Sequence, residues 1–162
     1  LAYQTLRQLC PEILAQDKGY IVTRSQNRVS ILLYNYEHFN DIFASNKTLN
    51  VNKTNRYTPF DDQQRRPFHI RLSNLPARPV SESVEFIVNR DHGSAYDYWL
   101  RMGAPDGGKC PSLDQYRLEL LKASAHPLVH SIQPRISQGV LEYDAVLEPL
   151  EFRLIQINFC DN

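Results

Sequence analysis

The chain has 162 residues, of which 42% are hydrophobic and 10% aromatic, and its 18 basic and 18 acidic side chains give a formal net charge of zero. This length and apolar content suit a single globular domain that buries a core of its own. The charge balance argues against nucleic acid and anionic membrane surfaces as partners, and no apolar run approaches the roughly 20 residues that span a bilayer.

The opening segment predicts a helix over residues 1–16. Apolar side chains recur there at helical spacing, namely Tyr3, Leu6, Cys10, Ile13 and Leu14. Gly19 supplies a stop, and Pro11 predicts a kink or a division into two short helices. Since the first residue is Leu1 rather than Met, we expect a piece of a longer protein, with this helix packed on a neighbouring domain.

From Tyr20 onward the apolar period changes to two, which is typical of strands. Residues 19–39 predict two strands joined by a turn at 25–27, and the polar residues 45–66 predict a long loop. Further strands are expected at residues 67–75, 83–90, 128–137, 139–148 and 150–159. Seven or so short strands predict a mainly β fold, an antiparallel β-sandwich.

Two helices are expected as an insertion over residues 94–125. Ser94 and Asp97 form a capping-box-like start for the first, whose apolar face comprises Ala95, Tyr98, Trp99 and Met102. Gly103 and Pro105 end it. For the second helix we expect a cap at Ser112 with Gln115, an apolar face of Leu113, Tyr116 and Leu120, and an end at His126-Pro127.

Asp91, His92 and Ser94 have the composition of a catalytic triad, but neighbouring residues on a strand point to opposite faces. We therefore interpret this stretch as a strand, a helix cap and a helix. His126 and His130 are four residues apart, but Pro127 and the strand pattern exclude the helical geometry that two metal ligands at this spacing require. We expect no metal site and no cofactor.

Acidic pairs provide no obvious glycosidase site, which needs two carboxyl groups facing each other across a cleft. Asp61 and Asp62 lie in a polar loop, and Glu82 and Glu85 are expected on opposite faces of one strand. A sugar-stacking platform is an alternative, made from Tyr34, Tyr36, Phe39, Tyr57 and Phe60. The three cysteines are widely spaced, which favours a reduced, cytoplasmic compartment.

Four stretches resemble the C-terminal region of glycoside hydrolase family 39, the β-xylosidase-like family. They are YIVTR (20–24), ILLYNYEHFND (31–41), NRDHGSAYDYWLRMGAP (89–105) and FRLIQI (152–157). The resemblance implies a β-sandwich over residues 19–162 that packs against a (β/α)8 barrel, with residues 1–18 as the last helix of that barrel. It also implies that both catalytic glutamates lie upstream, so that no residue of this chain is catalytic.

We accordingly expect a non-catalytic accessory domain whose partner is the upstream barrel, with sugar reached through the parent protein. Residues 34–41 further resemble a branch that is fused to an AraC-type transcriptional regulator. A parent that is a genuine xylan β-xylosidase and an autonomous carbohydrate-binding module remain as alternatives. The residues expected to make structural or interdomain contacts are Asn89, Arg90, Asp91, His92, Ser94, Tyr98 and Trp99.

Overall fold

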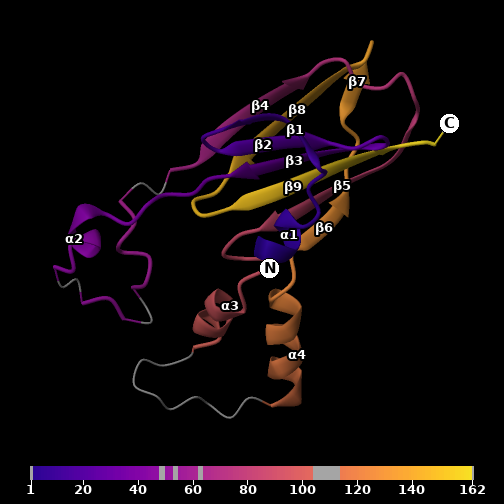
Figure 1. Ribbon diagram of the computed structural model, residues 1–162. Coiled ribbons are helices and arrows are strands. Elements are labelled where there is room, and N and C mark those ends of the chain that lie inside the picture. Colours follow the sequence, from indigo (N-terminus) through magenta and orange to yellow (C-terminus); the bar gives the residue numbers. More distant parts are fainter. Residues whose placement is uncertain (1, 48–49, 53–54, 62–63, 104–113, 162) are drawn as a thin grey trace.

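Two antiparallel sheets packed face to face make up the computed structural model, which describes all residues except 1, 48–49, 53–54, 62–63, 104–113 and 162 (Figure 1). The larger sheet has six strands, in the order β1 (Glu12–Asp17), β2 (Tyr20–Arg24), β3 (Arg28–Tyr34), β9 (Phe152–Phe159), β5 (Val80–Val88) and β6 (Leu128–Ser131). The smaller sheet has three, in the order β4 (Arg66–Leu72), β8 (Val140–Leu147) and β7 (Arg135–Ser137). The mainly β, antiparallel fold that the sequence predicts is confirmed.

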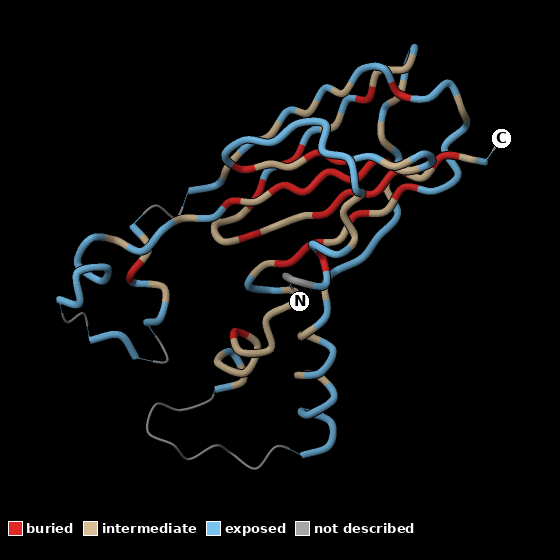
Figure 2. Tube along the Cα trace, in the orientation of Figure 1, coloured by how far each residue is buried: buried red, intermediate tan, exposed pale blue. Residues whose placement is uncertain are grey.

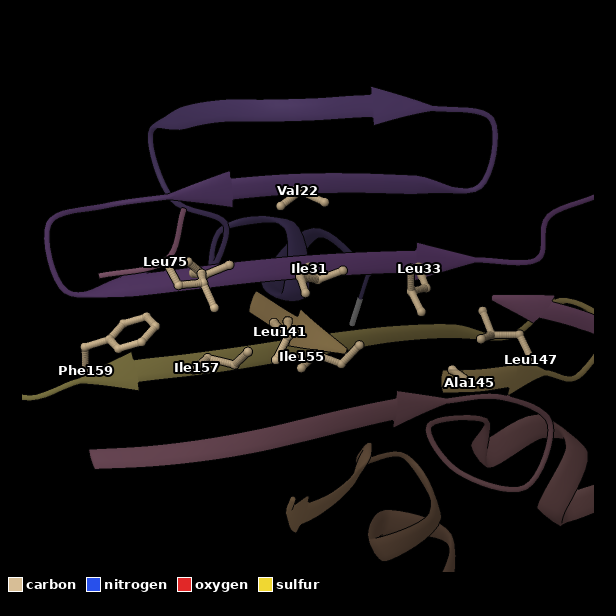
Figure 3. Packing of buried hydrophobic residues seen from close by; sticks show 11 residues of the cluster. Val22, Ile31, Leu33, Leu75, Leu141, Ala145, Leu147, Ile155, Ile157 and Phe159 are labelled. Carbon is tan, nitrogen blue, oxygen red and sulfur yellow. The ribbon is translucent and has the colours of Figure 1, made fainter. Parts of the chain in front are cut away.

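The core lies between the two sheets (Figure 3). Alternate residues of β3 and β9 face the smaller sheet, and the antiparallel register places Ile31 directly opposite Ile155. The smaller sheet contributes alternate residues of β8 to the same cluster. The central members of this cluster are Val29, Ile31, Leu33, Leu141, Ala145, Leu147, Ile155, Ile157 and Phe159.

The other face of the six-stranded sheet is also covered near its centre. Ser30 and Leu154, on that face of β3 and β9, are fully buried. The segment that follows helix α1 (Ala2–Leu6) lies against them, and the carbonyl of Gln8 accepts hydrogen bonds from Ser30 Oγ at 3.4 Å and Gln156 Nε2 at 3.2 Å. Because both faces of β3 and β9 are covered, these strands are buried along almost their whole length (Figure 2).

The helix predicted over residues 1–16 is wrong beyond its first turns. Helix α1 ends at Leu6, and the segment after Pro11 forms β1, which pairs with β2 through a tight turn where Gly19 has φ +102°. Pro11 cannot donate the amide hydrogen bond that a continuous helix needs, whereas β2 offers a free edge. All six residues of β1 are exposed, so its apolar spacing reflects no buried face. The assignment of residues 1–18 to a barrel stays a prediction.

Two further helices follow β5, as the sequence predicts. Helix α3 (Ala95–Arg101) begins at Ser94, whose hydroxyl accepts from the Asp97 amide at 3.3 Å. Helix α4 (Gln115–Ser124) is capped by Asp114 rather than Ser112, and Ser112 and Leu113 lie outside the described residues. The expected apolar face of α4 is not buried, because Tyr116 is 72% exposed. Among the described residues, no helix is long and apolar enough to cross a membrane.

Candidate functional site

The corner between β5 and α3 is built around Asn89. Its side-chain oxygen accepts hydrogen bonds from the backbone amides of Asp91 and His92, each at 2.9 Å. Its backbone amide donates to the His92 carbonyl at 2.8 Å. The Asn89 side-chain amide also donates to Glu151 at 3.0 Å, which ties the corner to the start of β9. The chain can therefore turn sharply here while its polar backbone groups stay paired.

Asp97 is the buried polar residue of this corner, with only 4% of its surface exposed. One carboxylate oxygen, Oδ2, accepts from the Tyr57 hydroxyl at 2.6 Å and from the Ser94 hydroxyl. The other, Oδ1, has no hydrogen-bond donor among the described residues, and its charged neighbour is Arg90 Nε at 3.6 Å. Burial, followed by the hydrogen bond to Asp97, raises the pKa of Tyr57 to about 12, so Tyr57 remains a donor at neutral pH.

Aromatic and cationic side chains surround Tyr57. The guanidinium groups of Arg56 and Arg90 lie 4.9 and 4.1 Å from the centre of its ring, within the range of cation–π attraction. Next to it, Phe39 contacts Phe60, with their ring centres 5.1 Å apart. These side chains, with Asp97, line a hollow of about 500 Å³ that we call the aromatic hollow; it also includes Phe43, Val51, Pro59, Val88, Asn89, Gly93, Ser94 and Leu150.

The structure brings together only part of the aromatic platform considered from the sequence. Phe39, Tyr57 and Phe60 line the aromatic hollow together. Tyr34 instead donates its hydroxyl to the carbonyl of Asp17 at 3.2 Å, and Tyr36 packs edge-on against His38. Helix α2 (Asp41–Ala44), which the sequence analysis did not predict, carries a further ring, Phe43, into the cluster.

A second hollow of about 660 Å³, the polar hollow, shares Asn89, Arg90 and Asp97 with the aromatic hollow. Its remaining charges are paired within the chain. Arg65 binds Glu148 at 2.8 Å, and Arg101 contacts Asp91 and also donates to the carbonyl of Arg90 at 3.1 Å. The two hollows share Arg90 and Asp97 and differ in their other cations: Arg65 and Arg101 of the polar hollow have carboxylate partners, whereas Arg56 of the aromatic hollow lies over aromatic rings.

The seven residues singled out from the sequence all lie at or beside this corner, but they do not form a catalytic relay. The carboxylate of Asp91 pairs with Arg101, and the hydroxyl of Ser94 contacts Asp97. Neither group is directed to His92, whose amide and carbonyl form the turn. Tyr98 and Trp99 are half-buried on α3, and the Trp99 ring packs 5.7 Å from that of Tyr96.

A buried ionic cluster between the sheets was missed by sequence reasoning. Glu85 on β5 is expected to point away from Glu82, and it does: its side chain is 3% exposed and faces the smaller sheet. There it accepts from the Tyr143 hydroxyl at 2.7 Å and contacts Arg153 Nη1 at 3.3 Å and His130 Nε2 at 2.9 Å. Burial, then the hydrogen bond to Glu85, raises the pKa of Tyr143.

Arg153 extends this cluster to a second buried carboxylate. Its guanidinium group also contacts Glu151, whose side chain is 1% exposed. A single cation therefore lies between two carboxylates that are almost completely removed from water. No sequence signal marked Glu85, because the apolar alternation of Val84, Phe86 and Val88 lies on the other face of the strand. No group of three possible metal ligands occurs among the described residues, and His130 contacts Glu85 instead.

No protein-family model and no curated protein sequence matches this chain. In structure it is similar to the GH39 enzyme from Xanthomonas axonopodis pv. citri, with a TM-score of 0.69 and 16% identity over 98% of this chain. It is also similar to a monomeric β-xylosidase from Caulobacter crescentus CB15, with a TM-score of 0.67 and 18% identity over 99% of this chain. The chain spans only 29% and 30% of the lengths of these two proteins. At these identities the likeness establishes a shared fold.

Proposed function

We propose that the chain is a non-catalytic accessory β-sandwich domain of a glycoside hydrolase family 39-like, xylosidase-like protein. The observation that carries this proposal is the fold match over 98% of the chain, which accounts for only 29% of the similar enzyme. Motifs at residues 20–24, 31–41, 89–105 and 152–157 support the same family. In this proposal the catalytic glutamates belong to a barrel upstream, and the sandwich buttresses that barrel.

An apolar groove beside α1 supports the proposal that another domain packs against this chain. The groove encloses about 320 Å³, and Leu6 and Tyr36 on its rim are 44% and 51% exposed. Its other lining residues are Thr5, Ile21, Leu32, Tyr34, Asn35, Leu150, Glu151 and Phe152. Burial of such exposed apolar surface against another domain is favourable. In this proposal the upstream barrel of the same polypeptide covers the groove.

The proposal also concerns the kind of protein to which this domain belongs. Residues 34–41 resemble the branch fused to an AraC-type regulator, so we propose a sugar-responsive transcriptional regulator as the parent, with a genuine β-xylosidase as the alternative. An autonomous carbohydrate-binding module is a further candidate, which the clustering of Phe39, Tyr57 and Phe60 favours.

The test begins with the native polypeptide, captured by an antibody to this chain and mapped by mass spectrometry. Peptides from an upstream barrel are expected, and a helix-turn-helix segment before that barrel would identify the regulator. Hydrolysis of a chromogenic β-xyloside is then measured for the native polypeptide and for the 162-residue chain, of which the latter is expected to be inactive. A native polypeptide without a barrel, or an active 162-residue chain, would overturn the proposal.

Hydrogen exchange tests the buttressing contact separately. Amides of residues 2–6 and 150–152, along the groove, are expected to exchange more slowly in the native polypeptide than in the 162-residue chain. Residues 66–72 of β4, at an edge of the smaller sheet, serve as the internal reference. Equal exchange along the groove in both samples would count against the barrel as the cover of this surface.

A further inference from the structure

We propose that the aromatic hollow is a binding site for a small sugar acid, a ligand that carries both hydroxyl groups and a carboxylate. The inference deepens the carbohydrate-binding candidate of the proposed function, which rests on the same rings, but it does not require an upstream barrel, because it concerns only the groups around Asp97. Three features of the hollow carry it: an acceptor without a hydrogen-bond donor, an arginine without a carboxylate partner, and an aromatic wall.

The acceptor without a donor is Asp97 Oδ1. Asp97 is only 4% exposed, yet its Oδ1 receives no hydrogen bond from any described residue. Tyr57 and Ser94 both donate to the other oxygen, Oδ2, so the carboxylate is held in place, while Oδ1, buried beside Arg90, keeps its capacity to accept. An unpaired buried acceptor is costly, and a ligand hydroxyl that donates to Oδ1 would remove this cost.

The available cation is Arg56. Among the described residues its guanidinium group contacts only the rings of Tyr57 and Tyr96, at 4.9 and 4.3 Å. Arg90, on the same hollow, approaches Asp97 at 3.6 Å, which is longer than a hydrogen bond. The cations confined to the polar hollow, Arg65 and Arg101, already contact carboxylates. Their electrostatic attraction for an added anion is therefore weaker than that of Arg56.

The wall of Phe39, Tyr57 and Phe60 suits the apolar face of a sugar ring, and about 500 Å³ is within the usual size of a small-molecule site. A neutral sugar would satisfy Asp97 but leave the Arg56 guanidinium group without an anion. A simple carboxylate such as acetate would pair with the guanidinium group but leave Asp97 without a hydrogen-bond donor. Only a ligand with both groups complements the hollow, which selects a sugar acid over either simpler class.

The experiment is a calorimetric titration of the 162-residue chain with D-glucuronate, D-glucose and acetate at low salt. Saturable binding of D-glucuronate is expected, with D-glucose and acetate each weaker by about tenfold or more, the loss that one charge-assisted hydrogen bond produces. Absence of saturable binding by D-glucuronate would overturn the proposal. Binding of D-glucose as tight as that of D-glucuronate would overturn the role of the cations.

Two variants and a matched control locate the site. Asp97→Asn replaces the free acceptor by an amide donor, and Arg56→Gln removes an exposed charge without disturbing buried groups. Each is expected to weaken D-glucuronate binding by about tenfold. Arg65→Gln, which removes a cation of the polar hollow, is expected to leave binding unchanged. Equal losses for Arg56→Gln and Arg65→Gln would mean that the anion binds by general charge, and would overturn the site even if Asp97→Asn fails to fold.

Discussion

The hydroxyl of Tyr143, on the three-stranded sheet, donates a hydrogen bond of 2.7 Å to the carboxylate of Glu85 in the six-stranded sheet. It is a polar link across a sandwich that is otherwise held together mainly by aliphatic packing. Because Glu85 is buried, the acceptor cannot turn to water when the donor is removed. The link therefore contributes more to stability than a hydrogen bond at the surface.

Tyr143→Phe is expected to lower the free energy of unfolding by about 1–3 kcal/mol, the cost of leaving a buried acceptor with one donor fewer. Urea unfolding followed by circular dichroism measures the change. Tyr116→Phe is the control, because Tyr116 is 72% exposed on α4 and its substitution should leave the midpoint unchanged. Identical midpoints for the two variants would contradict a stabilising link between the sheets.

Arg153→Met should be more damaging. The guanidinium group lies between the buried carboxylates of Glu85 and Glu151, and its loss removes the cation that both carboxylates contact. We expect a decrease of about 3–5 kcal/mol in the free energy of unfolding, although methionine keeps much of the volume. Arg71→Met is the matched control: Arg71 is exposed, 4.0 Å from Glu142, and should change stability by less than about 0.5 kcal/mol. A loss no larger than that of the control would show that the cluster does not stabilise the fold.

The pKa of Tyr57 provides a test at alkaline pH. Burial and the hydrogen bond to Asp97 raise this pKa to about 12 in the folded protein, against about 10 in an unfolded chain. The neutral hydroxyl therefore stabilises the fold fully below about pH 10, and this contribution is lost as the pH rises toward 12. In a spectrophotometric titration of tyrosinate, Tyr57→Phe should remove a component centred at about 12. Loss of a component near 10 instead would mean that Tyr57 is not buried against Asp97.

The cap of α3 provides the fourth test. Ser94→Ala removes the hydroxyl that accepts from the Asp97 amide and contacts the Asp97 carboxylate. We expect the free energy of unfolding to fall by about 1 kcal/mol, as measured for other helix caps. Ser94→Thr keeps the hydroxyl and should retain most of the stability. If both variants unfold at the same denaturant concentration as the original chain, Ser94 does not cap the helix in solution.

Several features were predictable because they depend on near neighbours in the chain. The alternation of apolar residues located β3, β4 and β5, and a high content of β-branched and aromatic residues located β8 and β9. Ser94 and Asp97 predicted the start of α3, because a cap and its partner lie three residues apart. The turn of Asn89 could be suspected from the same stretch, although its hydrogen bond to Glu151 could not.

The features that the sequence did not predict involve residues whose partners are distant in sequence, or strands that lie at an exposed edge. Strand β1 has no buried face, so no periodicity marks it, and its pairing with β2 overrides the helical spacing of Ile13 and Leu14. The apolar spacing of α4 predicted a buried face that this chain does not provide, as the exposure of Tyr116 shows. Charged residues such as Arg153 resemble surface residues in the sequence, and only their place between the sheets gives them a structural role.

Local patterns in the chain were enough to establish the class of fold and the position of most strands and helix starts, because periodicity and capping are properties of a few adjacent residues. Which polar groups meet depends on the packing of the folded chain. Tyr57 reaches Asp97 across 40 residues and Tyr143 reaches Glu85 across 58, contacts that depend on how loop and sheets pack. The free oxygen of Asp97 follows from the same packing: the chain buries the carboxylate and supplies donors to one side of it only.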